Sequence, residues 1–209
     1  MAEAEIIRWR WLCASLDLTS GPTGEVFARL SGAYANPRRA YHNLAHIGFC
    51  LETFDRLRGE AADPLTVELA IWFHDAVYAF QADDNEARSA DLARDCLTLL
   101  GVSPGRMKTV ADLIMVTRHD RPPETPDGRV IADVDLAILG APREEFLDYE
   151  RNIRREYAVV EDALFREKRL AVLEGFLARP SLFQTSTGKG LFEKAARLNL
   201  RQAIGRLRS

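Results

Sequence analysis

Cysteine is scarce in this chain of 209 residues, and its few copies do not form a motif. Cys13, Cys50 and Cys96 are odd in number and far apart in the sequence. None of them has the CxxC spacing that is typical of a zinc or redox site. We therefore expect reduced thiols and a cytoplasmic protein.

Long apolar runs, an export signal and a strong charge imbalance are also missing. The longest apolar stretches, such as residues 69–73, are far shorter than the ~20 residues that cross a bilayer. The N-terminus places acidic residues before its apolar stretch, the reverse of the order in a signal peptide. Lysine and arginine number 28 against 31 acidic residues, a net charge of −3. This charge gives no overall attraction to a polyanion, so we expect neither a membrane nor a nucleic acid polymer as a partner.

What the sequence does contain is helical periodicity. Apolar residues recur at helical spacing through most of the chain, and the strict alternation of a strand is nearly absent. These patterns predict an all-α protein with one domain over residues 1–209. Predicted helices cover about 43–58, 63–75, 83–101, 103–119, 142–157, 164–177 and 191–207.

Two segments are predicted to be loops. Residues 120–129 contain three prolines and an Asp-Gly pair, which disfavour regular backbone hydrogen bonding. Residues 180–190 precede the last predicted helix. The short apolar run at 130–140 is assigned neither to helix nor to strand, because periodicity alone does not separate the two.

The four histidines all lie in the first 119 residues, and three of them are at or near predicted helix ends. His74 is followed directly by Asp75 at the end of a strongly apolar helix. Adjacent helical residues point about 100° apart, so this pair can share an ion only if the ion lies in the angle between them. Other helices must then complete the site, and the candidates are His46 and Asp135, with Asp133 as the alternative to Asp135.

Imidazole and carboxylate ligands together indicate one divalent metal ion. They suit Mn, Fe, Co, Ni or Zn, and also Mg when more water enters the shell, so the ligand types do not determine the metal. Two carboxylates would neutralise the charge of such an ion.

The order of these residues resembles a known family. His46, then His74-Asp75, then Asp135 within an apolar run matches the H...HD...D signature of the HD superfamily. Seven stretches in order resemble the proteins described as predicted metal-dependent HD-superfamily phosphohydrolases: YHNLAHI, WFHDAVY, DNEARSA, the T-x-H of residues 117–119, DVDLAILG, IRREY and ARLNL. The resemblance extends from Tyr41 to the last predicted helix.

This resemblance implies a helical HD-type domain with N-terminal and C-terminal helical extensions around a central metal. It implies His46, His74, Asp75 and Asp135 as the metal ligands. The chemistry it implies is the hydrolysis of a phosphate ester or anhydride, for which we expect a nucleotide or another small phosphorylated metabolite as the substrate. The metal would activate water for the attack.

Further residues receive hypothetical roles beside the metal. Glu86 and His119, together with Asp75, are candidates for proton transfer. His42 is interpreted as a residue of the substrate pocket. The candidates for neutralising phosphate oxygens are arginines, whose guanidinium groups match phosphate geometry: Arg38, Arg39, Arg88 and Arg118.

Structural interpretations of the same residues remain open. The Asp83-x-x-Glu86 spacing is also typical of a capping box, in which Glu86 would stabilise the start of a helix. His119 at a helix end can interact with the terminal carbonyls. His42 can act as a cap outside its helix, and the arginines can be solvated surface charges.

Two other functions use the same pocket. An HD-type di-iron oxygenase normally adds two histidines between the HD pair and the last aspartate, whereas this chain has only His119 there. A non-catalytic nucleotide-binding sensor is the second alternative. The complete ligand set argues against it, because a binding module does not require four metal-ligating side chains.

Overall fold

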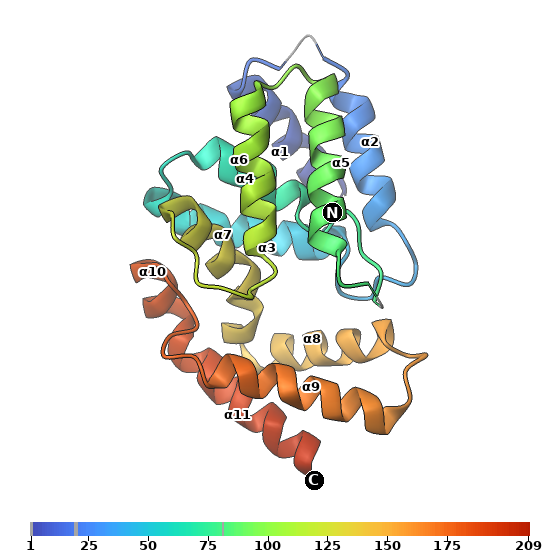
Figure 1. Ribbon diagram of the computed structural model, residues 1–209, viewed down its shortest axis with the longest axis vertical. Helices are drawn as coiled ribbons and strands as arrows, with labels where there is room; N and C mark the ends of the chain where they lie inside the picture. Colours follow the sequence, from blue (N-terminus) through green and yellow to red (C-terminus); the bar gives the residue numbers. More distant parts are fainter. Residues whose placement is uncertain (1, 19–20, 81) are drawn as a thin grey trace.

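The computed structural model describes residues 2–18, 21–80 and 82–209, and it contains helices and no strand in those ranges (Figure 1). The all-α prediction is therefore confirmed. The α-helices are α1 (Ala2–Ser15), α2 (Thr23–Tyr34), α3 (Leu44–Leu57), α4 (Pro64–Phe73), α5 (Asn85–Leu99), α6 (Pro104–Val116), α7 (Pro126–Leu136), α8 (Arg143–Glu156), α9 (Asp162–Leu177), α10 (Ser186–Gly188) and α11 (Lys194–Arg208). Three tighter or wider turns join them: η1 (Arg58–Glu60), η2 (Ala137–Gly140) and the π-turn η3 (Lys189–Glu193).

Helix α4 is the centre of the first half of the molecule. Every residue from Thr66 to Phe73 is buried, and α4 packs against α1, α3, α5, α6 and α7. A helix that is apolar on all sides must be surrounded by other elements. Its one charged residue, Glu68, accepts hydrogen bonds from Arg8 and Arg58 at 2.9 and 2.8 Å. The buried carboxylate is therefore paired with two guanidinium groups.

Local capping signals determine where the central helices begin. Asn43 caps α3, since its side chain accepts a hydrogen bond from the N–H of Ala45 at 2.9 Å. Asp63 caps α4 in the same way, and Pro64 occupies the first helical position. Both predicted starts are confirmed to within a residue.

The two predicted loops are partly helical, so those predictions are wrong in part. Helix α7 begins at Pro126, inside the predicted loop 120–129, and it includes the apolar run that periodicity left unassigned. Thr125 accepts a hydrogen bond from the N–H of Gly128 at 3.0 Å, and the proline needs no N–H partner in a first turn. In the second predicted loop, Thr185 caps a helix that begins at Ser186. Capping threonines thus start both helices.

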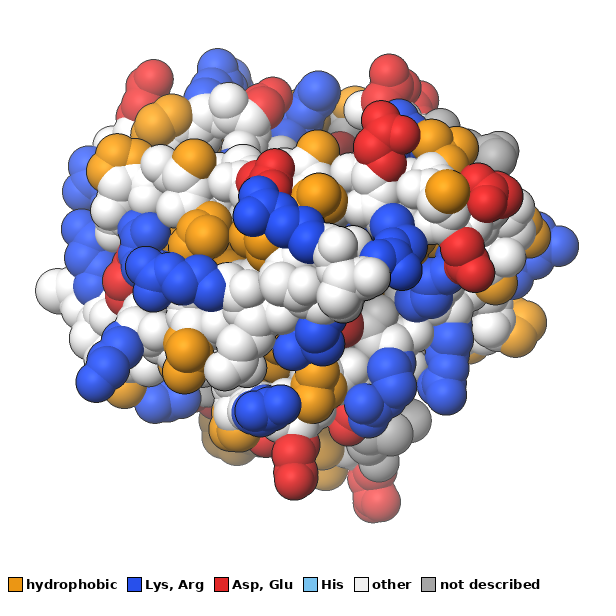
Figure 2. Space-filling model, turned by 90° about the horizontal axis from the view of Figure 1, so that it is seen from below, with side chains coloured by type: hydrophobic (Ala, Val, Ile, Leu, Met, Phe, Trp, Pro, Cys, Tyr) orange, Lys and Arg blue, Asp and Glu red, His pale blue; other side chains and the backbone are white. Residues whose placement is uncertain are grey.

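The C-terminal helices form a second region beside the first. In Figure 1, α8, α9 and α11 lie below α1–α7, where α11 packs against η2 and α9, and α8 packs against η2. Residues 142–209 carry 14 Lys and Arg against 10 Asp and Glu, whereas residues 1–141 carry 14 against 21. Seen from below, the C-terminal face shows many basic side chains (Figure 2). The near-neutral total charge is therefore the sum of a basic C-terminal region and an acidic N-terminal region.

No helix within the described ranges combines the length and the apolar character that crossing a membrane requires.

Candidate metal centre

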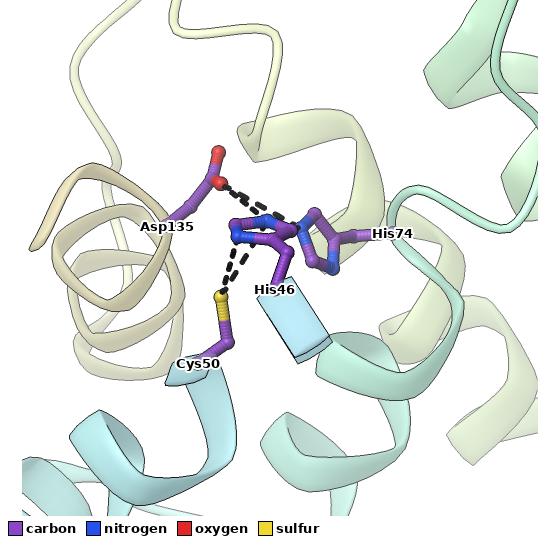
Figure 3. A group of neighbouring side chains, drawn as sticks. All are labelled: His46, Cys50, His74 and Asp135. Carbon is purple, nitrogen blue, oxygen red and sulfur yellow. Dashed lines mark hydrogen bonds and ion pairs between the residues drawn. The ribbon is translucent and has the colours of Figure 1, made fainter. Parts of the chain in front are cut away.

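Three helices bring the predicted ligands together. His46 lies in the first turn of α3, His74 ends α4, and Asp135 lies near the end of α7. Asp75 follows His74 in the turn after α4. Because α3, α4 and α7 pack against one another, these side chains meet in one place. Figure 3 shows His46, His74 and Asp135 converging there.

The distances within this group suit a metal ion. The Nε2 atoms of His46 and His74 are 3.3 Å apart. Asp75 Oδ2 is 3.4 and 3.3 Å from these two nitrogens, and Asp135 Oδ1 is 3.6 Å from each. Ligands bound at ~2.1 Å to a tetrahedral ion are about 3.4 Å from one another. The two imidazole nitrogens therefore lie at the spacing expected of two ligands of one divalent cation, and an oxygen of each carboxylate lies close to that spacing from both nitrogens.

Backbone contacts hold the His74-Asp75 pair in place. Nδ1 of His74 lies 2.8 Å from the carbonyl oxygen of Ile71, so this nitrogen donates and Nε2 faces the group. The guanidinium group of Arg39 donates to the carbonyls of Asp75 and Ala76, at 2.7 and 3.0 Å. The turn that carries the pair is thus fixed without a metal.

Cys50 also lies beside this group, and the sequence analysis did not place it there. Its Sγ atom lies 3.7 and 3.6 Å from Nδ1 and Nε2 of His46, on the same helix one turn later (Figure 3). His46, Cys50, His74 and Asp135 each offer one potential ligand atom, and these atoms lie within 4.8 Å of one another. The spacing of four residues between His46 and Cys50 was the available signal, because it places both on one helix face.

The charges of the group favour cation binding. Burial opposes ionisation of Asp75 and Asp135, but the adjacent imidazoles outweigh it and hold the pKa of both carboxyls well below the usual range. Burial also lowers the pKa of His74, yet the two carboxylates raise it well above its ordinary value. A cation would displace the proton that this imidazole carries, so metal binding should release protons and weaken in acid.

Asp133, the alternative to Asp135, lies elsewhere. Its side chain is fully buried and accepts hydrogen bonds from the N–H of Gln184 at 2.7 Å and from the N–H and hydroxyl of Thr185 at 2.8 and 2.6 Å. These contacts use both carboxylate oxygens. The structure therefore places Asp135, and not Asp133, beside the histidines.

His119 joins the group through Asp135. Its Nε2 atom is 2.8 Å from Asp135 Oδ2, the oxygen that does not face the other histidines. The residue follows α6 with a left-handed backbone, at a φ of 55°, and its carbonyl accepts a hydrogen bond from Arg179 at 2.6 Å. This backbone conformation turns the imidazole toward α7.

His42 lies on the other side, just before α3. Its Nδ1 atom is 2.6 Å from Glu156 Oε2, and its ring stacks on Tyr78 with the centroids 4.1 Å apart. The centroids of His42 and His46 are 5.9 Å apart. His42 is therefore a neighbour of the metal centre, held by α8, and the structure places it outside the group of potential ligands.

The remaining predicted residues are not part of the centre. Arg88 and Arg118 lie near Asp84 and Asp120, at 3.8 and 3.3 Å, in exposed pairs close in sequence. Arg38 is exposed. Among the described residues, Glu86 has neither a hydrogen bond nor an ion pair with the metal ligands. The predicted capping box is wrong, because α5 is capped by Asp84 without a side-chain hydrogen bond.

Comparisons of the chain with protein-family models, with curated proteins and with solved structures find no match.

Proposed function

We propose that this protein is a metal-dependent hydrolase of a phosphate ester or anhydride in a nucleotide or another small phosphorylated metabolite. The observation that supports the proposal best is that the Nε2 atoms of His46 and His74 lie 3.3 Å apart and that each lies 3.3 to 3.6 Å from an oxygen of Asp75 and of Asp135. The order of these residues in the chain also matches the HD signature. A site that offers two imidazoles and two carboxylates suits the metals that support phosphate hydrolysis.

The residues around the metal would have two roles, metal binding and proton transfer. When bound, a divalent ion supplies a Lewis acid that polarises a phosphoryl oxygen and activates water. His46, His74, Asp75 and Asp135 would hold that ion. His119 has a side chain that is 12% exposed and touches Asp135. It therefore lies at the entrance, where an imidazole can accept a proton from water or give one to the leaving group.

Solvent reaches the carboxylates of the group more than it reaches the imidazoles. The side chains of Asp75 and Asp135 are 16% and 19% exposed, whereas those of His46 and His74 are 1% and 3% exposed. A ligand therefore reaches the centre from the carboxylate side. This arrangement favours the end of a small phosphorylated molecule over a bulky polymer.

The test combines metal analysis with a screen for phosphate release. Purified protein would be loaded with Mn²⁺, Co²⁺, Zn²⁺ or Mg²⁺ and incubated with nucleotides and other phosphorylated metabolites. We expect phosphate or pyrophosphate release that His74→Ala and Asp75→Asn abolish together with metal binding. Asp112→Asn is the matched control, because Asp112 pairs with Lys108 on the surface, and it should retain full activity.

Four results would reject the hydrolase. Fully metal-loaded protein could release nothing from any substrate, or His74→Ala and Asp75→Asn could match the wild type. A nucleotide that binds without being cleaved would instead indicate the sensor. Bound iron with an oxygen-dependent product would indicate the oxygenase.

A further inference from the structure

Tyr41 lies directly beside the metal centre, and Tyr149 packs against Tyr41. Tyr41 precedes α3, and its ring centroid is 4.8 Å from that of His46. Tyr149 comes from α8, and its ring centroid is 4.6 Å from that of Tyr41. The rings of His46, Tyr41 and Tyr149 therefore pack in a row, and α8 contributes the last of them.

Within the described part of the chain, neither tyrosine hydroxyl has an acceptor for its proton. The hydroxyl of Tyr41 is buried and has no hydrogen-bond partner among the described residues. The hydroxyl of Tyr149 accepts a hydrogen bond from Arg169 at 2.8 Å and can still donate its own proton. Buried polar groups without partners are rare in proteins because they are costly. The Tyr41 hydroxyl is such a group, and its place beside the centre indicates a ligand with acceptor atoms.

Arg169 fixes the position of Tyr149. Its guanidinium lies over the Tyr149 ring, 5.2 Å from the centroid, and it also forms an ion pair with Glu150. The Arg169 side chain is only 11% exposed. It comes from α9, so α8 and α9 together hold the Tyr149 hydroxyl in one orientation.

We propose that the hydroxyls of Tyr41 and Tyr149 bind the phosphoryl oxygens of the substrate that the metal does not contact, and that Arg169 positions Tyr149. This inference rests on the proposed function. A phosphoryl group carries several acceptor oxygens, and donors aimed at them stabilise the charge of the transition state. The arginines predicted for this task are directed elsewhere, since Arg39 binds backbone carbonyls and Arg118 pairs with Asp120.

The experiment measures phosphate binding, turnover and metal content in parallel. Inorganic phosphate would be titrated into Mn²⁺-loaded protein by calorimetry, with kcat and KM measured on the best substrate of the screen. We expect Tyr41→Phe and Tyr149→Phe each to weaken phosphate binding about 10- to 100-fold. We expect kcat/KM to fall by on the order of 100-fold, with Mn²⁺ content unchanged.

Matched controls come from the same two helices. Tyr157→Phe removes a hydroxyl at the end of α8, where the ring packs between Phe80 and Phe165. Arg166→Met removes a guanidinium from α9 that donates to the carbonyl of Leu207. Both controls should bind phosphate like the wild type. Circular dichroism and thermal unfolding would identify any variant that fails to fold, and Tyr41→Phe decides the outcome if Tyr149→Phe is such a variant.

A double variant separates positioning from direct contact. If Arg169 acts through Tyr149, then Tyr149→Phe combined with Arg169→Met should bind phosphate no more weakly than Tyr149→Phe alone. Additive losses would overturn the positioning role of Arg169. Wild-type binding and turnover in both single Phe variants would overturn the tyrosine assignment while leaving the hydrolase intact. Wild-type protein that neither binds phosphate nor releases it would reject the hydrolase, and the tyrosine assignment with it.

Discussion

Asp133 and Asp135 lie two residues apart on α7 and have opposite surroundings. Asp133 is fully buried among neutral donors, the backbone N–H groups and hydroxyl of residues 184–185, and burial raises the pKa of its carboxyl. Asp135 is partly exposed among imidazoles, which hold the pKa of its carboxyl well below the usual range. Residues two apart on a helix point about 200° apart, so the two carboxylates face opposite sides.

The difference shows that the hydrogen-bonding neighbours of an aspartate, and not its residue type alone, decide whether its carboxylate supports the fold or can bind an ion. Neutral N–H donors satisfy Asp133 completely and give it no site for an ion. The imidazoles around Asp135 can exchange protons for a metal. One face of α7 therefore contacts the C-terminal segment, and the other face contributes Asp135 to the group of side chains that could hold a metal ion.

The largest effect that separates the two aspartates should be on metal affinity. Asp135→Asn removes a carboxylate next to both histidines, and we expect metal affinity to fall at least about 100-fold, since even outer contacts of a metal site are worth 10- to 100-fold. Calorimetric titration with Mn²⁺ or Co²⁺ would measure the change. Equal affinity in the wild type and the variant would remove Asp135 from the centre.

The next largest effect should be on stability. Asp133→Asn replaces an acceptor of three hydrogen bonds with an amide that directs N–H against N–H, and we expect the free energy of unfolding to fall by about 2 to 3 kcal/mol. Urea unfolding would measure the loss. Metal affinity should change far less than in Asp135→Asn. The reverse result, intact stability with lost metal, would exchange the roles of the two residues.

A smaller effect should follow from crowding Asp133. An added Cβ at Gly188 would lie 2.3 Å from Asp133 Oδ2 and 2.7 Å from Thr185 Oγ1, so Gly188→Ala should cost roughly 1 to 2 kcal/mol of stability. Gly190→Ala is the control, because its Cβ would meet nothing within 4 Å. Thermal unfolding of both variants would show whether the close approach of α10 to α7 is required.

The smallest effect concerns Glu156. This carboxylate has backbone N–H donors, like Asp133, and an imidazole neighbour, like Asp135. It accepts hydrogen bonds from the N–H groups of Tyr41 and His42, at 2.8 and 2.9 Å, and from the His42 imidazole. Burial opposes its ionisation, but these donors hold its pKa below the ordinary value. Ionised Glu156 therefore stabilises the fold above the usual carboxyl pKa, and this stabilisation is lost as the pH falls through the lower folded-state pKa.

Glu156→Gln should consequently be less stable than the wild type at pH 7, and the gap should narrow below about pH 4. Urea unfolding of metal-free protein at the two pH values would test this. A gap that stays constant with pH would show that Glu156 contributes by packing alone.

Local signals in the sequence were sufficient for part of the fold and the centre. The Asn43 and Asp63-Pro64 starts depend on contacts within a few residues, so they were predictable, and so were the positions of His46 and His74 at helix ends. The choice between Asp133 and Asp135 was not, because it depends on residues about fifty positions later. The start of α7 was not predicted either, because the prolines and the Asp-Gly pair of residues 120–129 are typical of a loop.

The positions of two predicted phosphate-binding arginines depend on packing in a related way. Placing Arg88 or Arg118 near the metal required knowing where α5 and the end of α6 turn their side chains, and both residues found acidic neighbours nearby in sequence. Tyr41 and Tyr149 lie 108 positions apart, and only the packing of α8 brings their rings together. No short motif encodes that contact.

The carboxylates that hold the C-terminal segment also set an order of assembly. Asp133 binds residues 51 and 52 positions later, and Glu60 accepts hydrogen bonds from Ser186 and Thr187, 126 and 127 positions later. A chain leaves the ribosome N-terminus first. His46 and His74 therefore emerge long before the segment that anchors α7. During biosynthesis the two histidines are made long before the segment that fixes Asp135 beside them, so the group of side chains that could hold a metal is completed only near the end of synthesis.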